Sequence, residues 1–129
     1  MLPTLIKYLN SYEPLVNLIG PNRLFPIMAT DLSNPALEYT YKYVMGGIIK
    51  QSQFSINIVW NNYDDILKIE ESLLSALDME LSDQFITMGQ VQFNSRVTGG
   101  SVPMYRADMK LYMVNINFII KWRKVTNDN

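Results

Sequence analysis

The sequence predicts a single α+β domain in which an antiparallel sheet carries two main helices on one face. Three segments lead to this fold class. Residues 51–60 alternate apolar and polar side chains with the period of two that a half-buried strand requires. Residues 63–77 place apolar side chains at helical spacing, and residues 112–122 return to alternation. Because helices and strands are grouped along the chain, we expect the helices to lie on one face of the sheet.

Composition fits one globular domain spanning residues 1–129. Hydrophobic residues make up 48% of the chain and charged residues 18%, which is typical of a packed domain and not of a disordered segment. The net charge of −1 supplies no basic stripe for sequence-specific binding of duplex DNA. No apolar run reaches the ~20 residues of a membrane span, so no membrane association is expected. Residues 1–7 lack the pattern of a signal peptide, which predicts synthesis in the cytoplasm.

The N-terminal segment is expected to be helical. Apolar residues recur near helical spacing over residues 4–19, with Thr4 as the predicted N-cap. Pro14 should break this helix into two short pieces, because proline cannot continue the backbone hydrogen-bond ladder. Gly20 and the residues after it stop the helix, a short extended piece follows at residues 23–28, and residues 31–35 have loop chemistry.

Two neighbouring antiparallel strands are expected next, over residues 36–45 and 51–60, joined by a loop over residues 46–52. The helix of residues 63–77 then buries its apolar stripe against the sheet. Its aspartates, Asp64 and Asp65, lie near the N-terminal end, where the helix dipole favours negative charge.

The last third of the chain returns to strands. Residues 86–97 are expected to form one strand, with Val91 and Phe93 on one face. Residues 98–101 form a loop tip, and residues 112–122 form a long closing strand.

The residue inventory excludes most catalytic chemistry. The chain has no histidine and no cysteine, so it lacks the usual general base near neutral pH, the thiolate nucleophile and the preferred zinc ligands. Residues 78–83 offer carboxylates but not the pattern of an EF-hand, and a solvated loop is the simpler interpretation. We therefore predict no enzyme activity, no cofactor, and no catalytic or metal-binding residues.

The remaining candidates are surface features. The chain contains eight tyrosines and eight methionines, residue types that are enriched where protein surfaces meet but that also fill cores. Tyr39, Tyr41 and Tyr43 share one face of a predicted strand, and we interpret that face as an interface. The glycine pairs at residues 46–47 and 99–100 match no phosphate-binding motif and are interpreted as mobile hairpin tips.

Several short motifs follow one another in order over nearly the whole chain. They are RLFP at residues 23–26, NPALEY at 34–39, FSINIVW at 54–60 followed by YDDI at 63–66, YRAD at 105–108, and the closing strand at 112–122. Each motif is a packing pattern, so their order and spacing carry the information. Taken in this order, the motifs resemble a known family: the tail completion proteins of long-tailed bacteriophages and prophages, which act as tail terminators or in tail-to-head joining.

The resemblance implies a structural protein of the virion that forms a hexameric ring by self-association, caps the tail tube and meets the head–tail connector. DNA would pass through this ring without sequence-specific binding, and the free chain can be monomeric. The loops of residues 46–52 and 95–104 are expected to reach neighbouring subunits. The candidate interface residues are Tyr39, Tyr41, Tyr43, Gly46, Gly47, Arg96, Gly99, Gly100 and Tyr105.

Two other classes of function remain open at this point. One is a small peptide- or ligand-binding module that uses the tyrosine-rich sheet face as a groove. The other is an enzyme that relies on aspartate, glutamate, lysine or tyrosine alone. Oligomeric state separates the first of these from an assembly protein, because a ring requires contacts between copies.

Overall fold

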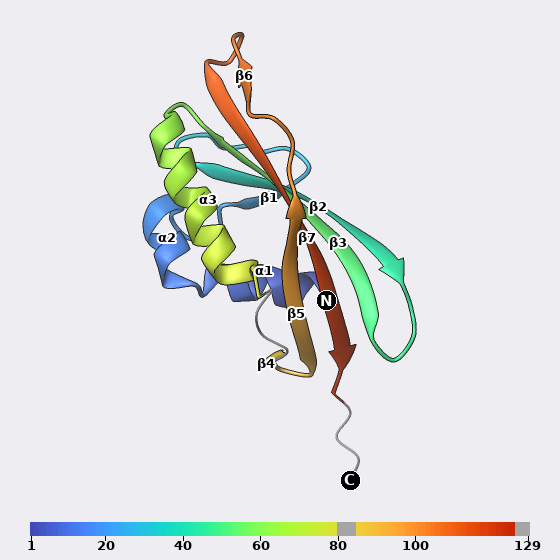
Figure 1. Cartoon of the computed structure of the whole chain (residues 1–129). Coiled ribbons are helices and arrows are strands. Elements are labelled where there is room, and N and C mark those ends of the chain that lie inside the picture. Colours follow the sequence, from blue (N-terminus) through green and yellow to red (C-terminus); the bar gives the residue numbers. More distant parts are fainter. Residues whose placement is uncertain (80–84, 126–129) are drawn as a thin grey trace.

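The computed structural model describes residues 1–79 and 85–125, which form three helices and a curled sheet of seven strands (Figure 1). The helices are α1 (Leu2–Asn10), α2 (Glu13–Ile19) and α3 (Tyr63–Leu77). The strands are β1 (Leu24–Pro26), β2 (Ala36–Met45), β3 (Lys50–Trp60), β4 (Ile86–Met88), β5 (Val91–Gly99), β6 (Met104–Arg106) and β7 (Leu111–Lys124).

The sheet has the strand order β1-β2-β3-β7-β5-β4, with β6 paired to the first part of β7. Every neighbouring pair is antiparallel except β1 and β2, which run parallel. The three helices lie together on one side of this sheet (Figure 1). The predicted α+β class is confirmed, and the short parallel β1 makes the sheet a mixed one.

The core lies between the helices and one face of the two longest strands. In β3 and β7 the even-numbered residues point to the helices, so Phe54 pairs across the strands with Phe118 and Ile56 with Ile116. All four are buried, as are the helix residues that cover them, including Leu9, Ile66 and Leu73. Burying each such side chain stabilises the fold by roughly 1.5–3 kcal/mol. The apolar residues of the alternating strand segments and those of the helical stripes therefore pack together in one core.

The N-terminal helix is divided, as predicted, but at a different residue. The break falls at Ser11 and Tyr12, and Pro14 lies in the first turn of α2. In that turn the N–H that proline lacks would have no helical partner anyway, so Pro14 starts the second helix and does not interrupt the first. The predicted N-cap at Thr4 is wrong, because α1 begins at Leu2 and Thr4 lies inside its first turn.

Helix α3 begins and ends at the predicted residues. Asn62 caps it, and its side-chain oxygen accepts a hydrogen bond from the backbone N–H of Asp65 at 3.2 Å. Buried residues recur along one stripe of the helix, which contacts β3, β5 and β7. None of the helices in the described ranges has the length and apolarity needed to cross a lipid bilayer.

The expectation of one strand over residues 86–97 is wrong. The chain turns at Gly89, whose φ of +63° favours glycine, and forms the antiparallel pair β4–β5. Strand β5 then continues to Gly99, so residues 95–99 belong to the sheet and not to the predicted loop. Likewise β3 begins at Lys50, which shortens the predicted loop of residues 46–52.

Two hairpins extend from the sheet beyond the helical layer, at opposite ends of the molecule (Figure 1). One joins β2 to β3, and the other joins β6 to β7. The first connects two long strands of the packed sheet, whereas the second connects the three-residue β6 to the first part of β7.

Candidate functional site

The turn between β2 and β3 exposes a group of large apolar side chains, which we call the hairpin tip. Ile48 is 88% exposed, an unusual position for isoleucine. Exposed apolar groups gathered in one place mark interaction surfaces more often than single exposed residues do. The hairpin tip consists of Tyr43, Val44, Met45, Ile48 and Ile49.

A second exposed apolar group lies on the projecting hairpin of β6 and β7, and we call residues 102–110 the arm. Val102 is 81% exposed, and the side chains of Met104, Tyr105 and Met109 are about half exposed. The arm is anchored at its base by an aromatic contact of Tyr105 with Tyr112, whose ring centroids are 4.8 Å apart. Tyr105 is thus placed both to hold the arm and to offer part of its ring to a partner.

The predicted tyrosine face exists, but its members differ in surroundings. Tyr39, Tyr41 and Tyr43 pair with β3 residues of the helix-covered face, so all three point to the helix side. Tyr39 packs on Phe54 with ring centroids 5.8 Å apart. Tyr41 shares a 2.7 Å hydrogen bond with the Ser52 hydroxyl, and burial raises the pKa of its phenol. Only the third tyrosine along the strand is mainly exposed, and it belongs to the hairpin tip.

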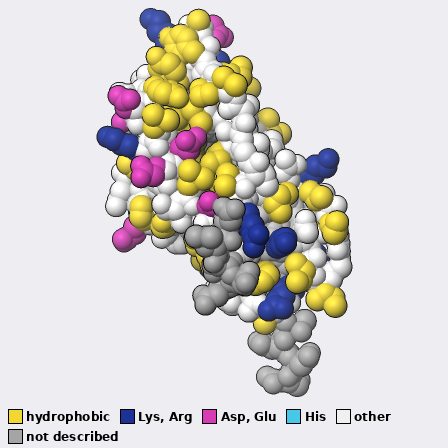
Figure 2. Space-filling view, viewed as in Figure 1, with side chains coloured by type: hydrophobic (Ala, Val, Ile, Leu, Met, Phe, Trp, Pro, Cys, Tyr) yellow, Lys and Arg dark blue, Asp and Glu magenta, His cyan; other side chains and the backbone are white. Residues whose placement is uncertain are grey.

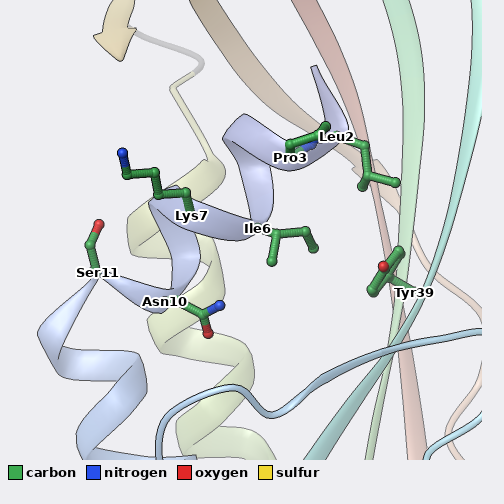
Figure 3. Close-up of a pocket in the computed structure, with 7 residues that line it drawn as sticks. All are labelled: Leu2, Pro3, Ile6, Lys7, Asn10, Ser11 and Tyr39. Atoms are coloured by element: carbon green, nitrogen blue, oxygen red, sulfur yellow. The ribbon is translucent and has the colours of Figure 1, made fainter. Parts of the chain in front are cut away.

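A groove of roughly 700 Å³ opens between α1 and β2 (Figure 3). The side chains of Leu2 and Ile6 point from the helix toward the ring of Tyr39, whereas Lys7 points away (Figure 3). Sequence reasoning missed this groove, because it forms only when the N-terminal helix packs beside a strand that follows much later in the chain.

The two glycine pairs have different roles. Gly46 and Gly47 lie in the turn between β2 and β3, as expected, and Gly47 has a φ of +118°. The interpretation of the second pair as a mobile tip is wrong. A Cβ on Gly100 would overlap the backbone carbonyl of Asn115 in β7, so this glycine permits a close approach of two backbones. Arg96 is exposed on β5, in register with Ile119 of β7.

Arg23 is a structural residue that the sequence did not single out. Its side chain is almost fully buried, and its guanidinium donates to the carbonyl oxygens of Pro35 (3.2 Å) and Asn34 (2.8 Å). It also pairs with the Asp31 carboxylate at 3.1 Å. Hydrogen bonds from the Ser33 hydroxyl and backbone, together with this ion pair, lower the pKa of Asp31. Arg23 therefore fixes the loop between β1 and β2.

That loop begins with a strained turn. Ile27 has a φ of +66°, a value that β-branched residues rarely adopt, and the N–H of Met28 bonds to the carbonyl of Pro26 at 2.7 Å. The turn directs both side chains into solvent: Ile27 is 74% exposed and Met28 63%. Such strain costs about 1–3 kcal/mol and commonly marks a functional position.

Reactive groups are not gathered in the part of the chain that the structure describes. Within residues 1–79 and 85–125, no three acidic side chains come close enough together to hold a metal ion. Residues 80–83 of the carboxylate-rich loop considered above lie outside the described ranges. Apolar side chains gather toward the upper end of the face drawn in Figure 2, which also shows Lys and Arg side chains close together in its lower half.

No protein-family model matches the sequence, and no curated protein matches it either. The fold, however, is similar to that of a chain in a solved structure described as the virion of a native gene transfer agent (GTA) particle. The TM-score is 0.68, and the alignment covers 93% of this chain and 92% of that chain at 8% sequence identity. At this identity the similarity establishes a shared fold. The chain therefore has the fold of a protein found in a virion particle.

Proposed function

We propose that this chain is a structural, non-enzymatic subunit of a virion. The observation that carries the proposal is the fold shared with a chain of a gene transfer agent virion over nearly the full length of both chains. The two exposed apolar ends support it, because a subunit that assembles keeps apolar surface for its partners.

Within the virion, the proposed role is tail completion. In this role a hexameric ring of the chain caps the tail tube and joins it to the head–tail connector, and DNA passes through without its sequence being read. The support is the order of motifs along the sequence together with exposed apolar groups at opposite ends of the subunit, which suit contacts with different neighbours. The chain would be made in the bacterial cytoplasm and reside at the head–tail junction.

The test is to delete the gene from a host that produces the particles and to image the products by electron microscopy. The proposal predicts filled heads and finished tails that remain separate, and restoration of joined particles when the gene is supplied from a plasmid. Intact, joined particles in the deletion strain would contradict the tail completion role. Absence of the chain from purified wild-type particles would contradict any virion role.

A second candidate is a peptide- or ligand-binding module, which the groove between α1 and Tyr39 favours. This groove includes one of the three tyrosines of the predicted face. A monomeric chain that binds a peptide or small molecule, with affinity lost on Ile6→Asp substitution, would support this alternative. The groove is open to solvent and would not enclose a ligand, so we rank assembly first.

A further inference from the structure

The outer edge of β2 loses its neighbour halfway along. Strand β1 pairs with β2 only from Leu37 to Tyr39, and the last bond at this edge runs from the N–H of Ile27 to the carbonyl of Tyr39 at 2.8 Å. Beyond it, β2 continues to Met45 with β3 on its other side. Within the described residues, the outer edge of this second half is bonded to no other strand.

Strand geometry identifies the backbone groups left open. Successive residues direct their N–H and C=O groups to opposite edges, and Tyr39 directs its carbonyl outward. Tyr41 and Tyr43 therefore also direct their N–H and C=O groups outward. Four backbone groups thus point away from β3 in a row, which is the pattern to which an added strand binds.

Apolar side chains flank this open edge at both ends. The strained turn places Ile27 and Met28 where β1 ends, and the hairpin tip lies at the far end of β2. The open edge therefore combines a backbone template with apolar anchors. An added strand gains hydrogen bonds from the first and side-chain contacts from the second.

The arm also combines an open strand edge with exposed apolar side chains, so it can pair with the β2 edge. Strand β6 pairs with β7 on one side, and no described strand pairs with its other side. The exposed side chains of Val102, Met104 and Tyr105 lie on or beside it. The arm and the β2 edge are also on opposite edges of the sheet, so one chain cannot join them to each other.

The available area is adequate for a contact between copies. One side of the contact consists of Ile27, Met28 and the hairpin tip, and the other side consists of four arm residues. Each of these side chains leaves on the order of 100 Å² exposed, which gives roughly 1,000 Å² for all of them together. Specific interfaces begin at about 1,200 Å², and the paired backbones would supply the difference. A single contact should be weak, whereas a closed ring would reinforce it.

We infer that the arm of one copy adds as a strand to the β2 edge of the next copy, with the residues of the hairpin tip packing against the arm. The contact is heterologous, because the two surfaces differ, and heterologous contacts that close by rotation form rings. This inference rests on the proposed assembly function and specifies which surfaces carry it.

The test of the edge compares Tyr43→Pro with Tyr43→Thr, using sedimentation velocity over rising protein concentration. Both variants remove the exposed ring, but only proline removes the outward N–H and blocks the edge. Self-association of Tyr43→Pro should be at least about tenfold weaker than that of Tyr43→Thr, since the added strand loses a hydrogen bond and meets the proline ring. Thermal unfolding checks that both variants remain folded.

Mixing tests the partner. Val102→Asp places a charge on the arm and leaves the β2 edge intact. On its own, this variant should self-associate as weakly as Tyr43→Pro does. An equimolar mixture of the two variants retains one native contact, between the arm of the Tyr43→Pro chain and the edge of the Val102→Asp chain. The mixture should therefore form a heterodimer that neither variant forms alone, which misfolded chains could not do.

Several results would overturn the contact. Equal self-association of Tyr43→Pro and Tyr43→Thr would show that the edge is not used. Normal association of Val102→Asp, or failure of the mixture to form heterodimers, would exclude the arm as the occupant. A wild-type chain that stays monomeric at millimolar concentration would also contradict the contact. None of these results bears on whether the chain is present in virions, which the deletion experiment tests separately.

Discussion

Gly100 contacts the β7 backbone so closely that no side chain fits between the strands. We predict that Gly100→Ala lowers the free energy of unfolding by about 2–3 kcal/mol, because the atoms in the way are backbone atoms that cannot rotate aside. The matched control is Gly89→Ala. Its added Cβ meets no atom within 4 Å, so the only destabilisation comes from the φ of +63°, which alanine disfavours. That control should cost about 1 kcal/mol. Urea unfolding of both variants measures the difference, and equal losses would contradict the close approach.

Tyr8 links α1 to the C-terminal end of α3, because its hydroxyl donates to the carbonyl oxygen of Ala76 at 2.8 Å. Burial, and to a lesser extent Tyr12, raises the pKa of this phenol above its usual 10.0. A raised folded-state pKa means that the contribution to stability is complete below pH 10 and is lost as pH rises through the folded-state value.

Tyr8→Phe should therefore reduce the loss of stability between neutral pH and the alkaline range, while costing about 1 kcal/mol at pH 7 for the lost hydrogen bond. The measurement is the free energy of unfolding as a function of pH for both proteins. Parallel curves above pH 10 would show that Tyr8 does not titrate in this way.

Single residues also show where sequence reasoning reached its limit. Alternation placed the three tyrosines of β2 on one face correctly, since pattern determines side-chain direction. It could not show that the helices cover the first two and leave Tyr43 exposed, because that depends on where α1 ends in space. Arg23 was missed because its partners are carbonyl oxygens of a loop, which carry no residue-type signal.

At the level of elements, β2, β3, α3 and β7 were predicted to within two residues, because each has a strong period and clear stop signals. The β4–β5 turn was missed because its sequence signal is one glycine between two short apolar segments. The break between α1 and α2 was placed too late, since proline is as suitable in the first turn of a helix as it is disruptive inside one. Local patterns therefore determined the long elements better than the short ones.

The loop between β1 and β2 depends on Arg23, and through its Leu32 side chain it covers the cluster formed by Val59, Leu111 and Met113. Arg23→Ala should lower the free energy of unfolding by about 3 kcal/mol, because it leaves buried carbonyls without donors. Arg23→Lys should rescue little of this loss, since an ammonium group cannot reach several carbonyls in a planar arrangement. A full rescue by lysine in urea unfolding would contradict the guanidinium geometry.

For the whole molecule, the exposed apolar ends predict that assembly and stability can be separated. Ile48 is 88% exposed, so Ile48→Asp should change the free energy of unfolding by less than about 0.5 kcal/mol. The same substitution should prevent self-association, because it places a charge in the proposed contact. Thermal unfolding and sedimentation velocity on the same sample give both values. Loss of stability together with association would mean that the hairpin tip serves the fold itself.

The hairpin tip and the arm overlap the two loops, residues 46–52 and 95–104, that were expected to reach neighbouring subunits. Their residues come from two separate segments of the chain, residues 43–49 and residues 102–110. Only the sheet order, with β2 near one edge and β6 on the other, shows that the two apolar groups are far apart. The sequence resemblance pointed to assembly through these loops and through Tyr43 and Tyr105, and the fold shows which exposed apolar side chains the loops carry.

The most direct test of the virion role is to locate the chain in purified particles by cryo-electron microscopy. The proposal predicts density that fits this fold, repeated around the tail axis as a hexameric ring between the tail tube and the head connector. Particles whose head–tail junction is fully occupied by other proteins, with this chain absent from the virion, would contradict it.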